Sequence, residues 1–432
     1  MYRFAPSPTG DIHIGNLRAA LFNYICAKQN SDRFIVRIED ADKAENIERM
    51  DKDILALLDT FGIKYDSVYY QSENFKYHLQ FASTLLDEKK AFMCFCTEDE
   101  LEEKRKIAKK EKRAYRYDGT CENLSSDYIL NSTKPFVIRM KKPIYNISFD
   151  DTIKGSLTFN GEAVDSFVIM RVDKYPTYNF ACAIDDMLQG VTHIIRGEEH
   201  LSNTPKQEHI RKSLGYSEKI TYTHLPIILN KLGKKMSKRD DASSVQWLLD
   251  QGYIPEAIIN HLILLGNKPP KEIFTLEEAI EWFDINLISK SAAKFDIEKL
   301  RFINIEHIKL LSNEELAKRI GYSGKGIGKL AKLYTQEGST TFEIKQKIDA
   351  IFAPKHIEGK FGQNLEKLKE IVQNAPEFEE FGDFKKYLMN ESGFKGESLF
   401  KPLKVLLTNN QNGPELTHLY PLIKNYIKEV AK

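Results

Sequence analysis

The sequence has no uncharged apolar run near the roughly 18 residues that a membrane-spanning helix needs, and no apolar core of a signal peptide at its start. Cysteine is scarce: five residues, an odd number, fit a reducing cytosol and exclude a disulfide-stapled scaffold. Neither charge sign is in excess, because 63 Lys and Arg offset 62 Asp and Glu to a net +1. That balance excludes a histone-like or polybasic membrane-surface protein. We find no repeat and no low-complexity tract.

What is present is typical of a folded protein. The chain of 432 residues is 42% hydrophobic and 29% charged, and its length predicts about three compact units. A large enzyme or multidomain binding protein in the cytoplasm fits these figures, and local basic patches leave a nucleic-acid partner open.

Strand and helix patterns alternate over residues 1–90. Tyr2–Ala5 predicts a short strand that leads into a proline-rich turn, and apolar residues from Leu17 to Ile25 recur at the spacing of one helix face. The continuous run Phe34–Ile38 predicts a strand buried on both faces. This order predicts a parallel sheet covered by helices.

The pattern changes further along the chain. Strand-like segments at 136–141 and 147–160 predict an inserted α+β unit, and strand patterns return at 166–171, 194–198 and 226–229. Beyond residue 240 the apolar period is helical, which predicts a helical C-terminal region.

Two segments could carry chemistry. In the first, Arg3 to Asn16, a strand ends, the chain turns, and a helix begins near Gly15, whose N-terminus can bind an anion. His13 can donate to a phosphate there. The second, Lys234-Lys235-Met236-Ser237-Lys238-Arg239, places four cations and a hydroxyl within six residues. Such a loop can close on a triphosphate, although a solvated basic loop would look the same.

Together these segments resemble the two signature motifs of class I aminoacyl-tRNA synthetases. His13-Ile14-Gly15-Asn16 stands where that class has HIGH, with Asn16 in place of the second histidine, and Lys235 to Arg239 stands where it has KMSKS. The runs RFAPSPTG, FIVRIED, YPTYNFACAIDD and IRGEEH are similar to the bacterial glutamate enzymes of the class. The resemblance is strong over residues 1 to about 300 and weak beyond.

The resemblance implies an ATP-dependent ligase that forms glutamyl-adenylate and transfers glutamate to the 3′ end of tRNA(Glu). It implies catalytic roles for His13, Gly15, Lys235 and Lys238, and ATP binding by Pro6, Ser7, His13, Gly15, Asn16, Lys238 and Arg239. Adenylyl transfer needs positioning and charge neutralisation, and Lys238 suits the pyrophosphate side. Mg²⁺ is expected to accompany ATP, held mainly by phosphates and water.

The amino-acid pocket must hold two carboxylates and one ammonium. By resemblance, Arg3 and Arg196 bind carboxylates, Glu39 and Ser7 face the ammonium, and Tyr178 adds a hydroxyl. From the residues alone, Glu39 could instead cap a helix with Asp40, and Arg196 could pair with Glu198 or Glu199.

The resemblance further implies four domains. They are a Rossmann-type α/β catalytic domain (1–91 and 165–240), an inserted acceptor-stem-binding domain (92–164), a helical stem-contact domain (241–310) and an α-helical anticodon-binding domain (311–432). The basic stretch from Lys104 to Arg116 could contact the acceptor stem or be a solvated helix face. We expect a monomer that binds no membrane.

Cysteines in the insertion are similar to a zinc site of some relatives. Cys94-x-Cys96 is followed after 24 residues by Cys121, but Asn123 stands where a histidine ligand is usual. Tyr117 could complete the four ligands, as in a shorter relative; otherwise the cysteines are reduced thiols in an apolar segment.

Three other functions remain open. The chain could be a synthetase for glutamine, or one that loads glutamate onto tRNA(Gln), alone or together with tRNA(Glu). It could be a relative that modifies a tRNA base with glutamate, or a non-catalytic tRNA-binding paralogue. The helical region after 310 argues against the β-barrel of glutamine enzymes and against the shorter base-modifying proteins. Arg301 and Arg319 are the only arginines from 301 onward, so few guanidinium groups could read an anticodon there.

Overall fold

The computed structural model describes residues 1–41, 46–237, 240–357 and 359–432, and these form two compact units. The first unit comprises Met1–Val245 and Leu262–Phe295, and the second comprises Gln246–His261 and Asp296–Lys432. Residues 241–310, expected to be one helical domain, are therefore divided between the two units. No described helix combines the length and apolarity needed to cross a bilayer.

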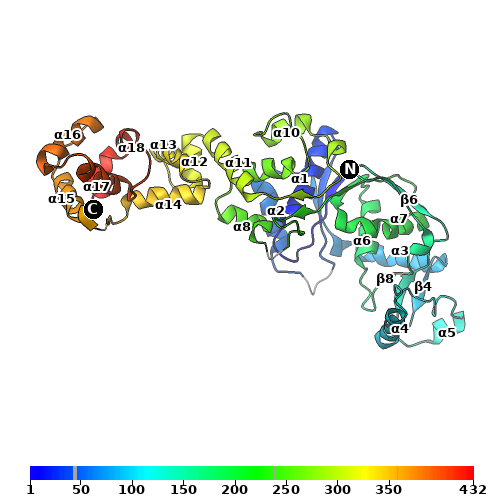
Figure 1. The fold of residues 1–432 in the computed structure, drawn as a ribbon. Helices are drawn as coiled ribbons and strands as arrows, with labels where there is room; N and C mark the ends of the chain where they lie inside the picture. Colours follow the sequence, from blue (N-terminus) through cyan, green and yellow to red (C-terminus); the bar gives the residue numbers. More distant parts are fainter. Residues whose placement is uncertain (42–45, 238–239, 358) are drawn as a thin grey trace. The chain divides into compact units, whose positions relative to one another are not determined.

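A seven-stranded sheet lies at the centre of the first unit (Figure 1). Its order is β3-β2-β1-β9-β10-β6-β7, and all neighbours are parallel except the β6–β7 hairpin. The strands are β1 (Tyr2–Phe4), β2 (Phe34–Ile38), β3 (Ser67–Tyr70), β6 (Ile147–Asp151), β7 (Gly155–Phe159), β9 (His193–Gly197) and β10 (Thr221–Leu225). Chain order reverses between β1 and β9, and such a switch point leaves a crevice at the carboxyl ends of the strands. The predicted α/β fold class is confirmed.

Helix α1 (Ile14–Gln29) follows β1 and is buried along most of its length. It contacts β1 and β9 and also α10 (Leu276–Trp282), so apolar side chains on several of its sides are covered. The predicted helix near Gly15 is confirmed, and it begins one residue earlier. Its N-terminus therefore lies just beyond the carboxyl end of β1.

A second, three-stranded sheet has the order β4-β5-β8, from β4 (Ala91–Cys94), β5 (Val137–Met140) and β8 (Val168–Met170). It shares an apolar core with helices α3 (Phe75–Asp87), α6 (Tyr178–Leu188) and α7 (Thr204–Ser213). The remaining elements of this unit are α2 (Met50–Thr60), η1 (Gln71–Asn74), α4 (Glu98–Lys110), α5 (Ser126–Asn131), η2 (Gly161–Ala163), η3 (Glu198–Asn203), η4 (Asp241–Ser243) and η5 (Ile285–Leu287), with the short pair β11 (Ile228–Leu229) and β12 (Ala293–Lys294).

Strand pairing corrects three predictions. Residues 147–160, assigned to the insertion, form β6 and β7 of the main sheet, whereas 166–171 contains β8 of the small sheet. The strand expected at 226–229 is mainly the two-residue β11, and the main-sheet strand there is Thr221–Leu225. A local apolar pattern predicts that a segment is a strand, but it does not reveal which sheet supplies the distant partner.

The second unit is helical, as predicted. Its helices include α11 (Ile297–Leu310), α12 (Asn313–Arg319), α13 (Lys325–Leu333), α14 (Thr341–Phe352), α15 (Gly362–Gln373), α16 (Phe381–Ser392), α17 (Glu397–Thr408), α18 (Leu416–Ile423) and α19 (Ile427–Val430), with short turns η6 (Tyr334–Gln336), η7 (Gly359–Phe361) and η8 (Lys424–Tyr426). Most of helices α8 (Val245–Asp250) and α9 (Pro255–Leu264) also belongs to this unit. Asn304 joins two of its segments, because its side chain accepts from the Ile254 N–H at 2.8 Å and donates to the Ser339 carbonyl at 2.7 Å.

Candidate active site

A cavity of about 600 Å³ opens at the carboxyl ends of β1, β9 and β10. Of the residues predicted for ATP and glutamate, the following line this one cavity: Arg3, Pro6, Ser7, His13, Gly15, Asn16, Glu39, Tyr178, Arg196 and Lys235. Lys238 and Arg239 lie outside the described residues. The two motif segments, more than 200 positions apart in the sequence, therefore line the same cavity, as their pairing predicts.

His13 caps helix α1 with its own side chain. Its Nδ1 accepts the Gly15 N–H at 3.0 Å, and burial, the largest influence, lowers the pKa of the imidazole below its usual value. A neutral ring that accepts at Nδ1 carries its proton on Nε2. Nε2 is buried and has no partner among the described residues, so it is a donor without an acceptor on the cavity wall. A Cβ at Gly15 would come within 3.3 Å of Nδ1, which favours glycine there.

The segment around Lys235 is anchored beside β11. The Met236 N–H donates to the Ile228 carbonyl at 3.0 Å, and the Met236 side chain is buried, whereas Lys235 is exposed. Beyond the segment, the Val245 N–H donates to the Ile12 carbonyl at 3.1 Å. These bonds hold a cationic side chain and the first turn of α1 at the same cavity.

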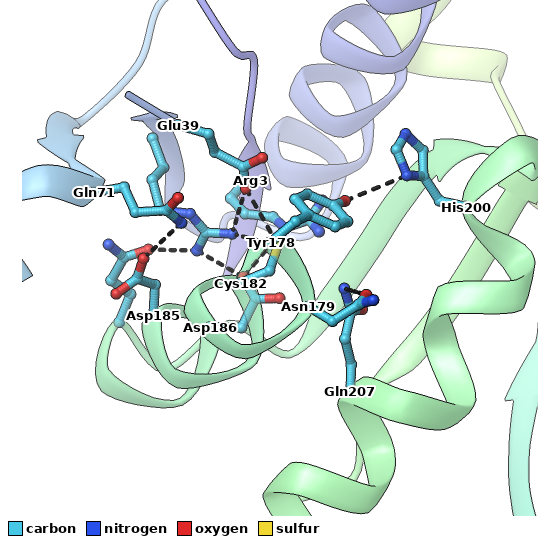
Figure 2. A network of polar contacts seen from close by, with 12 residues as sticks. Arg3, Glu39, Gln71, Tyr178, Asn179, Cys182, Asp185, Asp186, His200 and Gln207 are labelled. Atoms are coloured by element: carbon cyan, nitrogen blue, oxygen red, sulfur yellow. Dashed lines mark hydrogen bonds and ion pairs between the residues drawn. The ribbon is translucent and has the colours of Figure 1, made fainter. Parts of the chain in front are cut away.

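A buried ionic network lies beside the part of the cavity that Arg3 and Glu39 line (Figure 2). Asp186 of α6 accepts from Arg37 Nη1 at 2.7 Å and from Arg3 Nε at 3.3 Å. Burial alone would raise the pKa of Asp186, but Arg37 and Arg3 outweigh it and lower the pKa to about 2. The carboxylate therefore stays ionised and fixes Arg3, the middle residue of β1.

Glu39 follows β2 and is buried. Its Oε1 lies 3.2 Å from the Cys182 thiol and 3.3 Å from Arg37 Nη2. Burial is the largest influence and raises the pKa of Glu39 despite Arg37. Helix α2 begins at Met50 with Arg49 before it, so Glu39 does not cap it. Glu39 instead offers a carboxylate to the cavity, where a cationic ligand group could pair with it.

Arg196, at the end of β9, is held by neutral partners. Its Nε donates to His224 Nε2 at 3.2 Å and its Nη2 donates to the Thr204 hydroxyl at 2.7 Å. Its Nη1 is buried and without a partner among the described residues. The alternative of an ion pair with Glu198 or Glu199 is not observed among the described residues, and Glu198 pairs with Lys154 instead.

Tyr178 opens helix α6 and is partly exposed, with its hydroxyl 3.3 Å from His200 Nδ1. Both residues line the cavity, and Figure 2 shows their side chains directed at each other. Burial, followed by Arg196, lowers the pKa of His200 to about 4, so this imidazole is neutral near pH 7. A neutral hydroxyl–imidazole pair thus faces the same space as the two arginines.

Several polar residues of this region were missed at the sequence level. They are Arg37, Asp185, Asp186, Thr204, Asp151 and His224, all buried. The Asp185 carboxylate accepts from Gln71, Asn74 and His78, each at 2.9 Å. Figure 2 shows the contact with Gln71. One signal was available: an arginine inside the apolar run Phe34–Ile38 must find a buried carboxylate.

The three insertion cysteines converge. The thiols of Cys94, Cys96 and Cys121 lie within 4.8 Å of one another, and the Cys96 and Cys121 sulfurs are 3.6 Å apart. The Tyr117 hydroxyl is 3.4 Å from the Cys94 sulfur and 3.5 Å from that of Cys96. Zinc–sulfur bonds of about 2.3 Å at tetrahedral angles separate sulfurs by roughly 3.7 Å, so these four atoms suit a tetrahedral ion.

Comparisons with known proteins agree with this geometry. Residues 1–302 match the family described as tRNA synthetases class I (E and Q), catalytic domain. Proteins named "Glutamate--tRNA ligase 1" from a Nitratiruptor species and from Campylobacter curvus are 60% and 59% identical, with 100% of both chains covered in each case. A solved glutamate tRNA ligase from Elizabethkingia meningosepticum, in complex with its amino acid, is similar at a TM-score of 0.83 and 28% identity, covering 99% of this chain and 97% of that one.

The match runs through most of the chain and includes both motif segments that share the cavity. The chain therefore belongs to the class I tRNA synthetases of the E and Q group.

Proposed function

We propose that this protein is a glutamate–tRNA ligase that activates L-glutamate with ATP and transfers it to the 3′ end of tRNA(Glu). The observation that carries the proposal is the single cavity lined by both motif segments, two arginines and Glu39. The name carried by relatives that match over the whole chain supports the same activity.

ATP is assigned to the side of the cavity formed by Pro6, Ser7 and the start of α1. There the Nε2–H of His13 donates to the phosphates, and Gly15 and Asn16 leave the helix N-terminus open to them. Lys235 adds positive charge as pyrophosphate leaves. Lys238 and Arg239 complete this set by their place in the motif. Mg²⁺, when bound with ATP, supplies further neutralisation through phosphates and water.

Glutamate is assigned to the adjoining part of the same cavity, next to Ser7. The unpartnered Nη1 of Arg196 and the guanidinium of Arg3 suit its two carboxylates, because planar guanidinium groups match carboxylates well. Glu39 and Ser7 suit the ammonium group, and the Tyr178 hydroxyl adds a further polar contact. In the proposed reaction one carboxylate of glutamate attacks the α-phosphorus of ATP, which forms glutamyl-adenylate and releases pyrophosphate.

The insertion is assigned to the acceptor stem of tRNA, and the helical second unit is assigned to the anticodon. Both arginines of the second unit are held in bidentate ion pairs, Arg301 with Glu343 at 2.9 and 3.1 Å and Arg319 with Glu256 at 2.9 and 2.6 Å. Neither guanidinium is therefore offered for base recognition without breaking a pair. We further propose a cytoplasmic monomer.

Zinc is assigned to the insertion. The thiolates of Cys94, Cys96 and Cys121 with the Tyr117 oxygen would hold it, and the sulfur–sulfur and sulfur–oxygen distances support this set. The ion would neutralise the thiolates and tie β4 to the segment 117–121, a structural role remote from adenylate chemistry.

Aminoacylation of separate tRNA(Glu) and tRNA(Gln) transcripts with labelled glutamate tests the function. We expect charging of tRNA(Glu). Charging of tRNA(Gln) as well, or instead, would move the enzyme to the non-discriminating or glutamine-tRNA alternative. Charging of neither, with tRNA still bound, would leave the non-catalytic paralogue. Glutamate-dependent pyrophosphate exchange, with and without tRNA, separates activation from transfer.

A further inference from the structure

We propose that Asp151, His224 and Thr204 are positioning residues for Arg196. They hold its guanidinium by two nitrogens and leave the third for a carboxylate of the substrate. The inference rests on the proposed function and deepens it, because it says how the site prefers a dicarboxylic amino acid. None of the three residues lines the cavity, so each acts through Arg196.

Each member of this chain of contacts is fixed by the next. The Asp151 Oδ2 lies 2.6 Å from His224 Nδ1 and also accepts the His224 backbone N–H at 2.9 Å. Its Oδ1 accepts the backbone N–H groups of Ile153 and Lys154 at 2.9 and 2.7 Å. Asp151 is the last residue of β6, so the β6–β7 hairpin at the edge of the main sheet supports the proposed amino-acid site. Sequence analysis had assigned this hairpin to the insertion.

The contacts dictate the protonation of His224. A carboxylate can only accept, so the short contact with Asp151 places a proton on Nδ1. A guanidinium can only donate, so the Nε of Arg196 requires a lone pair on Nε2. His224 is therefore neutral with its proton on Nδ1, and burial, the largest influence, lowers the pKa of this histidine accordingly. The Thr204 hydroxyl accepts from Nη2 at 2.7 Å and lies 3.1 Å from the same Nε2.

The neutral imidazole has an electrostatic consequence. It stands between Asp151 and Arg196, so the carboxylate orients the arginine without forming an ion pair with it. Arg196 is buried, and no carboxylate pairs with it in the described part of the chain. An unpaired buried cation is costly, and a ligand carboxylate relieves that cost whereas a neutral amide does not. The arrangement thus favours glutamate over glutamine.

The experiment measures KM for glutamate, KM for ATP and kcat in pyrophosphate exchange with tRNA present, for the full-length protein. His224→Leu removes the acceptor, and we expect glutamate KM to rise at least about ten-fold, the effect of losing one charge-assisted hydrogen bond, with ATP KM within two-fold. His224→Gln should recover most of the loss, because its amide can accept from Arg196 and donate to Asp151. Thr204→Val, nearly isosteric, should raise glutamate KM several-fold.

His209→Leu is the matched control, because His209 is also buried but bonds to Tyr145 and the Lys141 carbonyl instead. Its glutamate KM should stay at the wild-type value. An unchanged glutamate KM in folded His224→Leu or in Thr204→Val overturns the inference, as does an equal rise in ATP KM. If His224→Leu does not fold, Thr204→Val decides. Wild-type protein that shows no glutamate-dependent exchange would instead refute the proposed function itself.

Discussion

Replacing His13 by asparagine separates the helix cap that its imidazole makes at the start of α1 from the phosphate contact proposed for the same ring. Nδ1 caps the helix by accepting the Gly15 N–H at 3.0 Å, and Nε2–H is the donor assigned to the phosphates. Asparagine caps a helix well through its side-chain oxygen, but its shorter side chain does not present a donor where Nε2 lies. Alanine removes both groups. The two variants therefore distinguish a cap from a phosphate ligand.

The expected magnitudes differ by variant. His13→Ala should lose about 1 kcal/mol of unfolding free energy with the cap, whereas His13→Asn should stay within a few tenths of wild type. Both should lose the hydrogen bond to phosphate, which is worth about 1.5–3 kcal/mol for a charged partner. That loss corresponds to roughly a 10- to 150-fold decrease in kcat for adenylate formation.

Pyrophosphate exchange with tRNA present, alongside urea unfolding, measures both quantities. Because burial lowers the pKa of His13 below 6.5, the neutral ring predominates at pH 7 and kcat should be level from pH 7 to 8. It should fall only at pH values below 6.5, as protonation of Nδ1 breaks the bond from Gly15. A His13→Asn enzyme with wild-type kcat, or a loss in His13→Ala that follows stability alone, would refute the assignment.

Other substitutions test the remaining parts of the site. Asp186→Asn removes the carboxylate that two buried arginines share and should cost about 3–5 kcal/mol in urea unfolding. The pKa of Asp186 in the wild type is lowered to about 2, so its ionised carboxylate stabilises the fold by about 2 kcal/mol above pH 4. This stabilisation is lost as the pH falls toward 2. A variant whose unfolding free energy falls with pH as steeply as that of the wild type would contradict this. Metal analysis should find about one zinc per chain, lost in Cys121→Ser but kept in Cys26→Ser, and zinc-free wild type would remove the metal. Lys238→Ala should slow adenylate formation without weakening tRNA binding, with Lys231→Ala as control; unchanged turnover would exclude the loop from the mechanism.

Local patterns were enough for the elements that carry the motifs. The run Phe34–Ile38 is β2 and is buried throughout, and the helix expected near Gly15 begins at Ile14. Strands and helices of this kind are specified by neighbouring residues, so the motif residues fall at the strand ends where a parallel sheet opens its crevice. The resemblance to a known family then supplied the residues expected to bind ATP and glutamate, and those of them that the structure describes line one cavity.

The buried polar residues that hold the site residues in place could not be predicted in the same way. Asp151 and His224 lie 73 positions apart and meet only because β10 pairs with β6, a partner that no local pattern specifies. Their segments look like ordinary strands, and a buried aspartate or histidine carries no motif. The Arg37–Asp186 pair likewise joins β2 to α6 across 149 positions. Long-range pairing decides which polar residues become buried neighbours.

A crystal structure with a stable analogue of glutamyl-adenylate tests the central claim most directly, namely that one cavity holds the nucleotide and the amino acid side by side. We expect the analogue in the cavity at the start of α1 and the carboxyl end of β9, with its phosphate mimic at His13 Nε2 and its side-chain carboxylate at Arg196 Nη1. An analogue bound elsewhere, or bound here with neither contact, would contradict the account.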